Sequence, residues 1–174
     1  AAGDSKAVDK FLKQAELSTK GADVAIGLTQ AELQIQNNQF EQALATLIRV
    51  RKIKHKHPEV LTLLLRVYCQ LNDWDQVLKL LPSLKNSDRF SPDELLELAR
   101  QACFEKLKRA AMLPESHQLL EQWRQLPAEH KKDQRLVICY AEQLIKCDLH
   151  DEAEQLLAEK IQRHYQPELV SRYG

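Results

Sequence analysis

Apolar residues recur along most of the chain at intervals of three and four, which places them on one face of an α-helix. Polar pairs such as Asn37-Asn38 and Asn72-Asp73 interrupt this pattern, and Pro58 and Pro92 restart it, with Ser91 as a candidate N-cap. The pattern predicts an all-α chain with helix pairs at about 22–53, 58–84, 92–126 and 133–164. A single helix at about 4–18, ending before Gly21, is predicted to precede them.

Two sequence features recur at an interval of 34 residues. An aromatic residue begins a similar segment at Phe40 and at Trp74, and a proline begins a similar segment at Pro58 and at Pro92. This period in a helical chain is typical of tetratricopeptide (TPR) repeats, in which stacked helix pairs bury one another's apolar faces. The equivalent of Trp74 is His117 in the third pair, 43 residues later, and His150 in the fourth, a further 33 residues on. We therefore predict one domain over residues 1–174, a TPR-like right-handed α-solenoid whose third repeat has about nine extra residues.

The charge balance restricts the classes of partner. Lys and Arg number 25, as do Asp and Glu, so the net charge is zero. A neutral chain argues against bulk nucleic-acid binding and against simple adhesion to anionic lipid. The basic run from Arg51 to His57 is interpreted as cations that complement the carbonyls at a helix C-terminus, with anion binding as the alternative. The first residue is not Met, and a further Pro-Glu-Leu begins at Pro167, so we interpret the chain as a piece of a longer protein.

The residues that could carry chemistry form no catalytic or metal-binding motif. The four cysteines include no Cys-x-x-Cys pair and are predicted to be buried apolar residues, with disulfide or metal binding as alternatives. His55 and His57 are predicted to be exposed loop residues that could ligate a metal weakly, and His117 and His150 are predicted to pack between helices. No Ser/His/Asp order, metal-ligand spacing or Gly-rich phosphate loop occurs, so we predict that the chain is not an enzyme.

Three segments carry a family resemblance. They are His57-Pro58-Glu59-Val60-Leu61, then Trp74 followed by Leu80-Leu81-Pro82-Ser83, and then the run from Ala141 to Asp151. In this order, with the lengthened third repeat, they resemble the HemY proteins, inner-membrane TPR proteins of Gram-negative bacteria associated with haem biosynthesis. (An unrelated flavin-dependent oxidase shares the name, but the chain has no dinucleotide fingerprint.)

The resemblance implies a parent protein with two N-terminal membrane helices that this chain lacks, and a TPR region on the cytoplasmic side of the bacterial inner membrane. It also implies a role in a late step of protohaem synthesis, through contacts with other proteins that include haem-biosynthesis enzymes. It supplies no catalytic residue.

A candidate partner-binding groove follows from the repeat. The inner helix of each TPR pair lines the concave side at about its second, fifth, ninth and twelfth positions. The candidates are Glu32, Glu59, Thr62, Arg66, Cys69, Arg100, Cys103 and Glu142. Arg66 and Arg100, which lie 34 residues apart, could present guanidinium groups to a carboxylate of an acidic peptide or a haem propionate. Alternatively, each pairs with a neighbouring Glu in an internal ladder, worth about 0–1 kcal/mol per exposed pair.

These observations predict a non-catalytic scaffold that presents a concave surface to partner proteins. A haem or porphyrin carrier that uses the same groove is the alternative, and self-association through exposed end faces is a third. Haem requires an axial ligand, usually His or Cys. Because no Cys-x-x-Cys-His or Cys-Pro pair occurs, no cofactor is expected and haem binding is the less favoured outcome.

Overall fold

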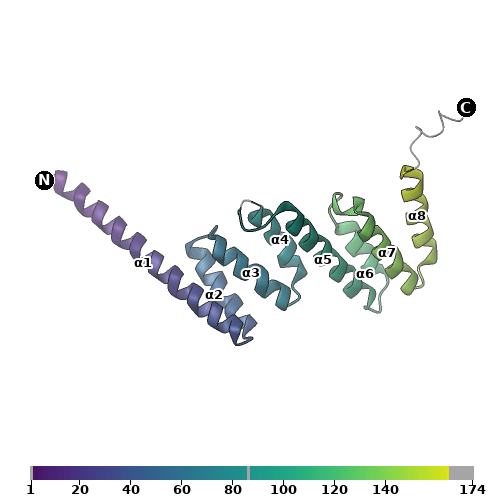
Figure 1. Cartoon of the computed structure of the whole chain (residues 1–174), viewed down its shortest axis with the longest axis horizontal. Helices are drawn as coiled ribbons and strands as arrows, with labels where there is room; N and C mark the ends of the chain where they lie inside the picture. The colour runs from purple at the N-terminus through teal and green to yellow at the C-terminus, as the bar shows by residue number, and fades with distance from the viewer. Residues whose placement is uncertain (1, 86, 165–174) are drawn as a thin grey trace, which may run out of the picture. The chain divides into compact units, whose positions relative to one another are not determined.

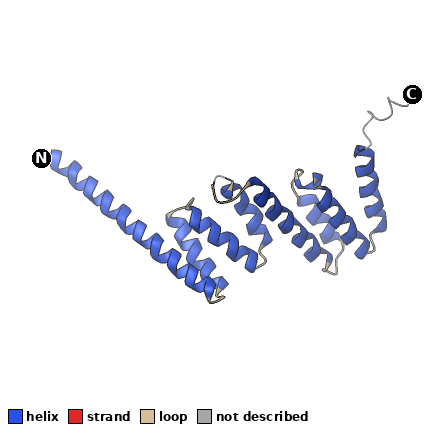
Figure 2. Cartoon of the chain, viewed as in Figure 1, coloured by secondary structure: helices blue, strands red, loops and turns tan. Residues whose placement is uncertain are grey.

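The computed structural model describes residues 2–85 and 87–164, and the side chains of residues 18–85 and 87–160. Every regular element in this part of the chain is helical (Figure 2). The elements are α1 (Ala2–Gln36), α2 (Phe40–Ile53), α3 (Pro58–Gln70), α4 (Trp74–Leu84), α5 (Pro92–Ala111), α6 (His117–Gln125), the short 3₁₀ helix η1 (His130–Lys132), α7 (Gln134–Lys146) and α8 (His150–His164). The all-α prediction is confirmed. The Pro-Glu-Leu segment at Pro167 lies outside the described residues.

The second helix of each pair begins where the repeat pattern places it. Helices α2, α4, α6 and α8 start at Phe40, Trp74, His117 and His150. Helix α5 has 20 residues where α3 and α7 have 13, and the connection at 112–116 is two residues longer than the one at 71–73. Seven of the nine extra residues of the third repeat therefore lengthen its first helix, and two lengthen the turn.

The turns inside the other three pairs share one backbone geometry. Asn38, Asn72 and Asp148 have φ values of 56°, 55° and 58°, in the left-handed region that Asn and Asp tolerate better than other non-glycine residues. The N–H of the next residue donates to the carbonyl five positions back, as in a Schellman motif. These bonds are Gln39 N to Gln34 O (2.8 Å), Asp73 N to Tyr68 O (2.9 Å) and Leu149 N to Leu144 O (2.9 Å). The repeated turn fixes where each second helix starts.

Helix α1 corrects the prediction for the N-terminal region. Residues 4–18 and 22–36 were expected to form two helices separated at Gly21, but α1 runs unbroken from Ala2 to Gln36. A glycine in a helix interior costs only about 1 kcal/mol relative to alanine. Because no proline or turn sequence accompanies Gly21, that cost does not end the helix.

The contacts divide the chain into two compact units, and the assignment of residues 1–174 to one domain stays a prediction. Unit 1 covers Ala1–Leu96 and unit 2 covers Glu97–Gly174, so α5 contributes residues to both (Figure 1). In unit 1, α2 packs on α1 and α3, and α3 packs on α4. In unit 2, α7 packs on α6, η1 and α8. Each unit has a core of fully buried side chains: Leu47, Val50, Leu64, Val77 and Leu84 in unit 1, and Leu107, Leu119, Leu136 and Leu144 in unit 2.

Helices α1 and α2 make a close contact at Gly27. A Cβ atom on Gly27 would lie 2.3 Å from Cγ2 of Val50, which is itself buried. Two hydrogen bonds join the helices between this contact and the turn at Asn37-Asn38, from Thr46 Oγ1 to Gln34 Oε1 (2.9 Å) and from Arg49 to Gln30 Oε1 (3.1 Å). The absence of a side chain at position 27 therefore sets the spacing of this helix pair.

The N-terminus of α5 is closed by a capping box. The N–H of Ser91 donates to Glu94 Oε2 (2.7 Å), and the N–H of Glu94 donates to Ser91 Oγ (3.2 Å). The hydrogen bond from the Ser91 backbone holds the pKa of the Glu94 carboxyl below its usual value. Ser91 is thus the N-cap that the sequence predicts.

Candidate functional site

The four candidate residues of α3 share one face of that helix. Glu59, Thr62, Arg66 and Cys69 follow one another at helical spacing. Arg66 is exposed and the other three are half-buried. The Thr62 hydroxyl donates to the Pro58 carbonyl at 2.9 Å, so it serves its own helix.

Glu59 already has a cationic partner. An oxygen of its carboxylate lies 2.5 Å from the guanidinium of Arg89, in the connection between α4 and α5. The two side chains are partly exposed, and such a surface pair contributes about 0–1 kcal/mol to stability. The pair neutralises the acidic end of the α3 face, which leaves Arg66 as the charge that this face presents.

Arg66 has no ion pair or side-chain hydrogen bond with any residue that the structure describes. The internal ladder, in which a neighbouring glutamate would neutralise it, is therefore not formed here. Its guanidinium can donate to a planar carboxylate through two parallel N–H groups. Glu32, the candidate on α1, is likewise exposed.

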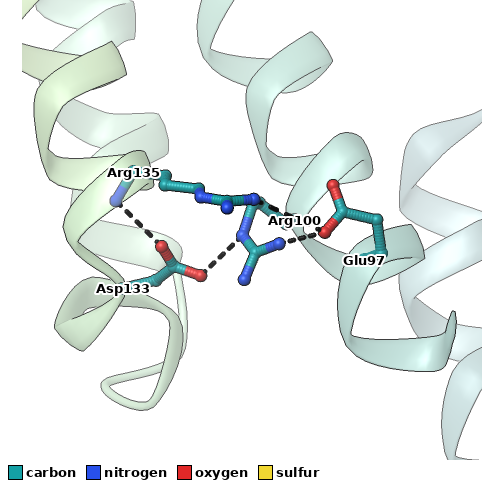
Figure 3. A network of polar contacts seen from close by, with 4 residues as sticks. All are labelled: Glu97, Arg100, Asp133 and Arg135. Carbon is teal, nitrogen blue, oxygen red and sulfur yellow. Dashed lines mark hydrogen bonds and ion pairs between the residues drawn. The ribbon is translucent and has the colours of Figure 1, made fainter. Parts of the chain in front are cut away.

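Arg100 is in the opposite situation. Its Nε donates to Asp133 Oδ2 at 2.7 Å, and a terminal guanidinium nitrogen bonds to the Glu97 carboxylate (Figure 3). Arg135 lies 4.0 Å from the same carboxylate. The Arg100 side chain is only 13% exposed. Arg100 is therefore paired within the chain, as in the ladder alternative, and is not available to a partner. Its partners are a glutamate and an aspartate.

The Arg100–Asp133 pair links α5 to the start of α7. Asp133 is the N-cap of α7, and its Oδ1 accepts a hydrogen bond from the backbone N–H of Arg135 at 2.9 Å. Burial acts to raise the pKa of Asp133, but the hydrogen bonds from Arg100 and Arg135 and the Arg100 charge outweigh it and hold that pKa below its usual value. The hydrogen bond to Asp133 likewise raises the pKa of Arg100. Both groups therefore remain charged at neutral pH.

Cys103 is wrongly placed by the groove prediction. It is fully buried, and burial raises the pKa of its thiol to about 11. It cannot contact a partner, because the twelfth helical position faces the core in α5. Cys139 is also buried, Cys69 and Cys147 are half-buried, and all four are free thiols. The interpretation as apolar core residues therefore holds for Cys103 and Cys139.

The predicted packing of two histidines between helices is wrong. The side chains of His117 and His150 are 72% and 66% exposed, close to the carboxylates of Glu115 and Asp148. Each is the first residue of its helix, and imidazole has less apolar surface to bury there than the indole of Trp74, which is half-buried at the equivalent position. His57 departs from expectation in the other direction: it is half-buried, and its Nδ1 is buried without a hydrogen-bond partner in the described part of the chain.

An aromatic pair packs two of the helices of unit 2 together. The rings of Trp123 on α6 and Tyr140 on α7 stack with centroids 4.2 Å apart and an interplanar angle of 7°. Burial raises the pKa of Tyr140 to about 12. Glu142, the candidate on α7, is exposed between the exposed side chains of Ile138 and Ile145.

Among the described residues, no three His, Cys, Asp or Glu side chains are grouped so that they could hold a metal ion. None of the helices within residues 2–85 and 87–164 is both long and apolar enough to cross a membrane.

The comparisons with known proteins agree with this architecture. A family model described as Tetratricopeptide repeat matches residues 1–66, which contain α1, α2 and most of α3. Protein HemY of Escherichia coli K12 is 24% identical over 168 residues, which cover 97% of this chain and 42% of that protein. Protein HemY of Shigella flexneri matches with the same values. The chain is therefore similar to the HemY proteins, and its first 66 residues match the tetratricopeptide repeat.

This HemY-like chain spans 42% of the length of these relatives. No solved structure matches it. Tetratricopeptide repeats form a helical repeat fold of a non-enzymatic kind, and they generally mediate contacts between proteins. The matches confirm the predicted repeat type and the predicted resemblance.

Sequence reasoning missed the partners of the candidate residues. Asp133, Glu97 and Arg89 engage Arg100 and Glu59, and none of the three was selected. A signal for Asp133 exists, since an Asp directly before an apolar-periodic segment is a typical N-cap. Nothing in the sequence indicates that Arg100 would reach it.

Proposed function

We propose that this HemY-like chain is a non-catalytic scaffold that docks partner proteins of a late step in protohaem biosynthesis. The observation that carries the proposal is Arg66, an exposed guanidinium on the inner helix of a TPR pair with no partner among the described residues. Its neighbours Glu59 and Thr62 are engaged within unit 1. The Arg66 guanidinium can therefore donate two parallel hydrogen bonds to a carboxylate of a partner protein.

The similarity to HemY supports the pathway and the location. We propose that the chain belongs to a longer protein at the bacterial inner membrane, with these repeats on the cytoplasmic side, and that its partners include haem-biosynthesis enzymes. Cross-linking of the full-length protein in its native membrane, followed by mass spectrometry, tests this. Recovery of a haem-pathway enzyme is the expected result, and its absence from repeated experiments would contradict the proposal.

Arg66→Gln is expected to weaken binding of the partner that cross-linking recovers by about tenfold, which corresponds to the loss of one charge-assisted hydrogen bond. Lys79→Gln is the matched control, because it removes another exposed cation of unit 1 without changing the α3 face. The affinity can be measured by titration calorimetry, with thermal unfolding as the check of the fold. Equal affinity of Arg66→Gln and the wild type would remove the proposed role of Arg66.

We expect that titration of haemin into the chain gives no saturable shift of the Soret band. His55 and His57 lie two residues apart in the connection between α2 and α3, and His117, His130 and His150 lie on three different elements. Cys103 and Cys139 are buried, so we expect no pair of these side chains to ligate the iron from both sides. Absorbance spectroscopy with free imidazole as a positive control measures this. A saturable shift would support the carrier function in place of the scaffold.

A further inference from the structure

A block of positive charge lies where α2 ends and α3 begins. Residues 49–57 contain five Lys or Arg and two His, and no Asp or Glu occurs from Gln42 to Pro58. Within this block, Lys52 and Ile53 end α2, and Lys54, His55 and Lys56 form most of the turn to α3. We call residues 52–56 the basic turn. Because the chain as a whole is neutral, this local excess of positive charge is balanced by acidic residues elsewhere in the sequence.

The charges of the basic turn are not neutralised by their surroundings. Lys52, Lys54 and Lys56 are exposed, and none makes an ion pair or a side-chain hydrogen bond with another residue that the structure describes. The nearest acid of α3, Glu59, is paired with Arg89. The connection between α2 and α3 lies at one end of this helix pair (Figure 1). The unpaired ammonium groups of the basic turn therefore belong to that end.

An apolar side chain lies among these cations. Ile53 is 39% exposed, between Lys52 and Lys54 in the chain. Exposed apolar and basic side chains together suit the boundary between lipid headgroups and acyl chains, where the cations meet anionic headgroups and the apolar group enters the interface. We propose that the basic turn binds an anionic lipid surface, with the lysines on the headgroups and Ile53 at the acyl boundary.

A nucleic acid fits the basic turn less well. Single-stranded nucleic acids are held by aromatic side chains that stack on the bases, as well as by positive charge. No Phe, Tyr or Trp lies between Phe40 and Tyr68. The net charge of zero argues against adhesion of the chain as a whole to an anionic membrane. However, salt screens the electric field of a charge within about 8–10 Å, so a lipid surface interacts with the charges nearest to it and not with the net charge of the chain.

Cosedimentation with lipid vesicles tests the proposal. The full chain is expected to sediment with vesicles that mix phosphatidylcholine and phosphatidylglycerol, to remain in solution with phosphatidylcholine alone, and to dissociate as sodium chloride is added. Lys52→Gln/Lys54→Gln/Lys56→Gln should lower the partition coefficient roughly 100-fold. Lys79→Gln/Lys132→Gln/Lys146→Gln is the control, since it removes the same charge from exposed lysines elsewhere.

Ile53→Ser separates a lipid surface from a polyanion. It should lower vesicle binding several-fold while leaving binding to single-stranded poly-uridylate unchanged. Three results would overturn the proposal: no sedimentation of the wild type with the anionic vesicles, equal losses in the two triple variants, or wild-type vesicle binding by Ile53→Ser. Arg66→Gln should bind vesicles as the wild type does, so failure of the lipid proposal and failure of the docking proposal can be told apart.

Discussion

Gly27→Ala is expected to lower the free energy of unfolding of unit 1 by about 2 kcal/mol. Alanine usually stabilises a helix relative to glycine, but here the added Cβ would lie 2.3 Å from Cγ2 of Val50. Val50 is buried, and its β-branched side chain has few alternative rotamers. The helices α1 and α2 would therefore have to separate, at a cost in packing. Urea unfolding followed by circular dichroism measures the change.

Gly21→Ala is the matched control in the same helix. Gly21 is exposed, and a Cβ there would meet no atom within 4 Å, so this substitution should raise the stability by about 1 kcal/mol. The double variant Gly27→Ala/Val50→Ala should lose less than the sum of its two single variants, because Val50→Ala makes room for the new methyl group. Equal stabilisation by Gly21→Ala and Gly27→Ala would contradict the close approach of α1 and α2.

Asp133→Ala is expected to lower the stability of unit 2 by about 3 kcal/mol. It removes the N-cap of α7, worth about 1 kcal/mol, and the charge-assisted bond to Arg100, worth about 2 kcal/mol. Asp133→Asn should cost less, because its amide oxygen can still accept from the Arg135 N–H. Thermal and urea unfolding of the two variants measure the difference. Equal costs for Ala and Asn would show that the contact with the helix end contributes little.

The contribution of Asp133 should also depend on pH. Its pKa is held below the usual value in the folded chain, so the charged pair stabilises the fold fully above the unfolded pKa, near 4, and loses this effect as the pH falls through the folded pKa. The stability difference between the wild type and Asp133→Asn should therefore be constant near neutral pH and shrink below about pH 4. A difference that stays unchanged in acid would contradict the charged pair.

Apart from the break expected at Gly21, the sequence predicts the helix boundaries well, because they depend on local chemistry. Pro58 and Pro92 begin their helices, Ser91 caps α5, and the turns at Asn38 and Asn72 end the first helices of two pairs. Each of these signals acts over a few residues. The extra length of the third repeat is also visible as a change in the spacing of the recurring sequence features, before any contact is known.

The candidate site could be predicted only in part, because its side chains depend on neighbours far along the chain. Arg66 and Arg100 occupy equivalent positions, yet one is exposed and the other is held by Asp133, 33 residues away. Likewise, Cys69 is half-buried while Cys103 is fully buried. Repeat equivalence fixes the helical face of a residue, whereas burial and pairing follow from what packs against that face.

The two tryptophans fall in different units. Trp74 is half-buried at the start of α4 in unit 1, and Trp123 stacks on Tyr140 in unit 2. The chain has only these two, so replacing either by phenylalanine leaves a single indole whose emission reports on one unit. Comparison of the two emission transitions would show directly whether the units unfold as one cooperative block or in succession, as nearest-neighbour coupling in repeat proteins allows.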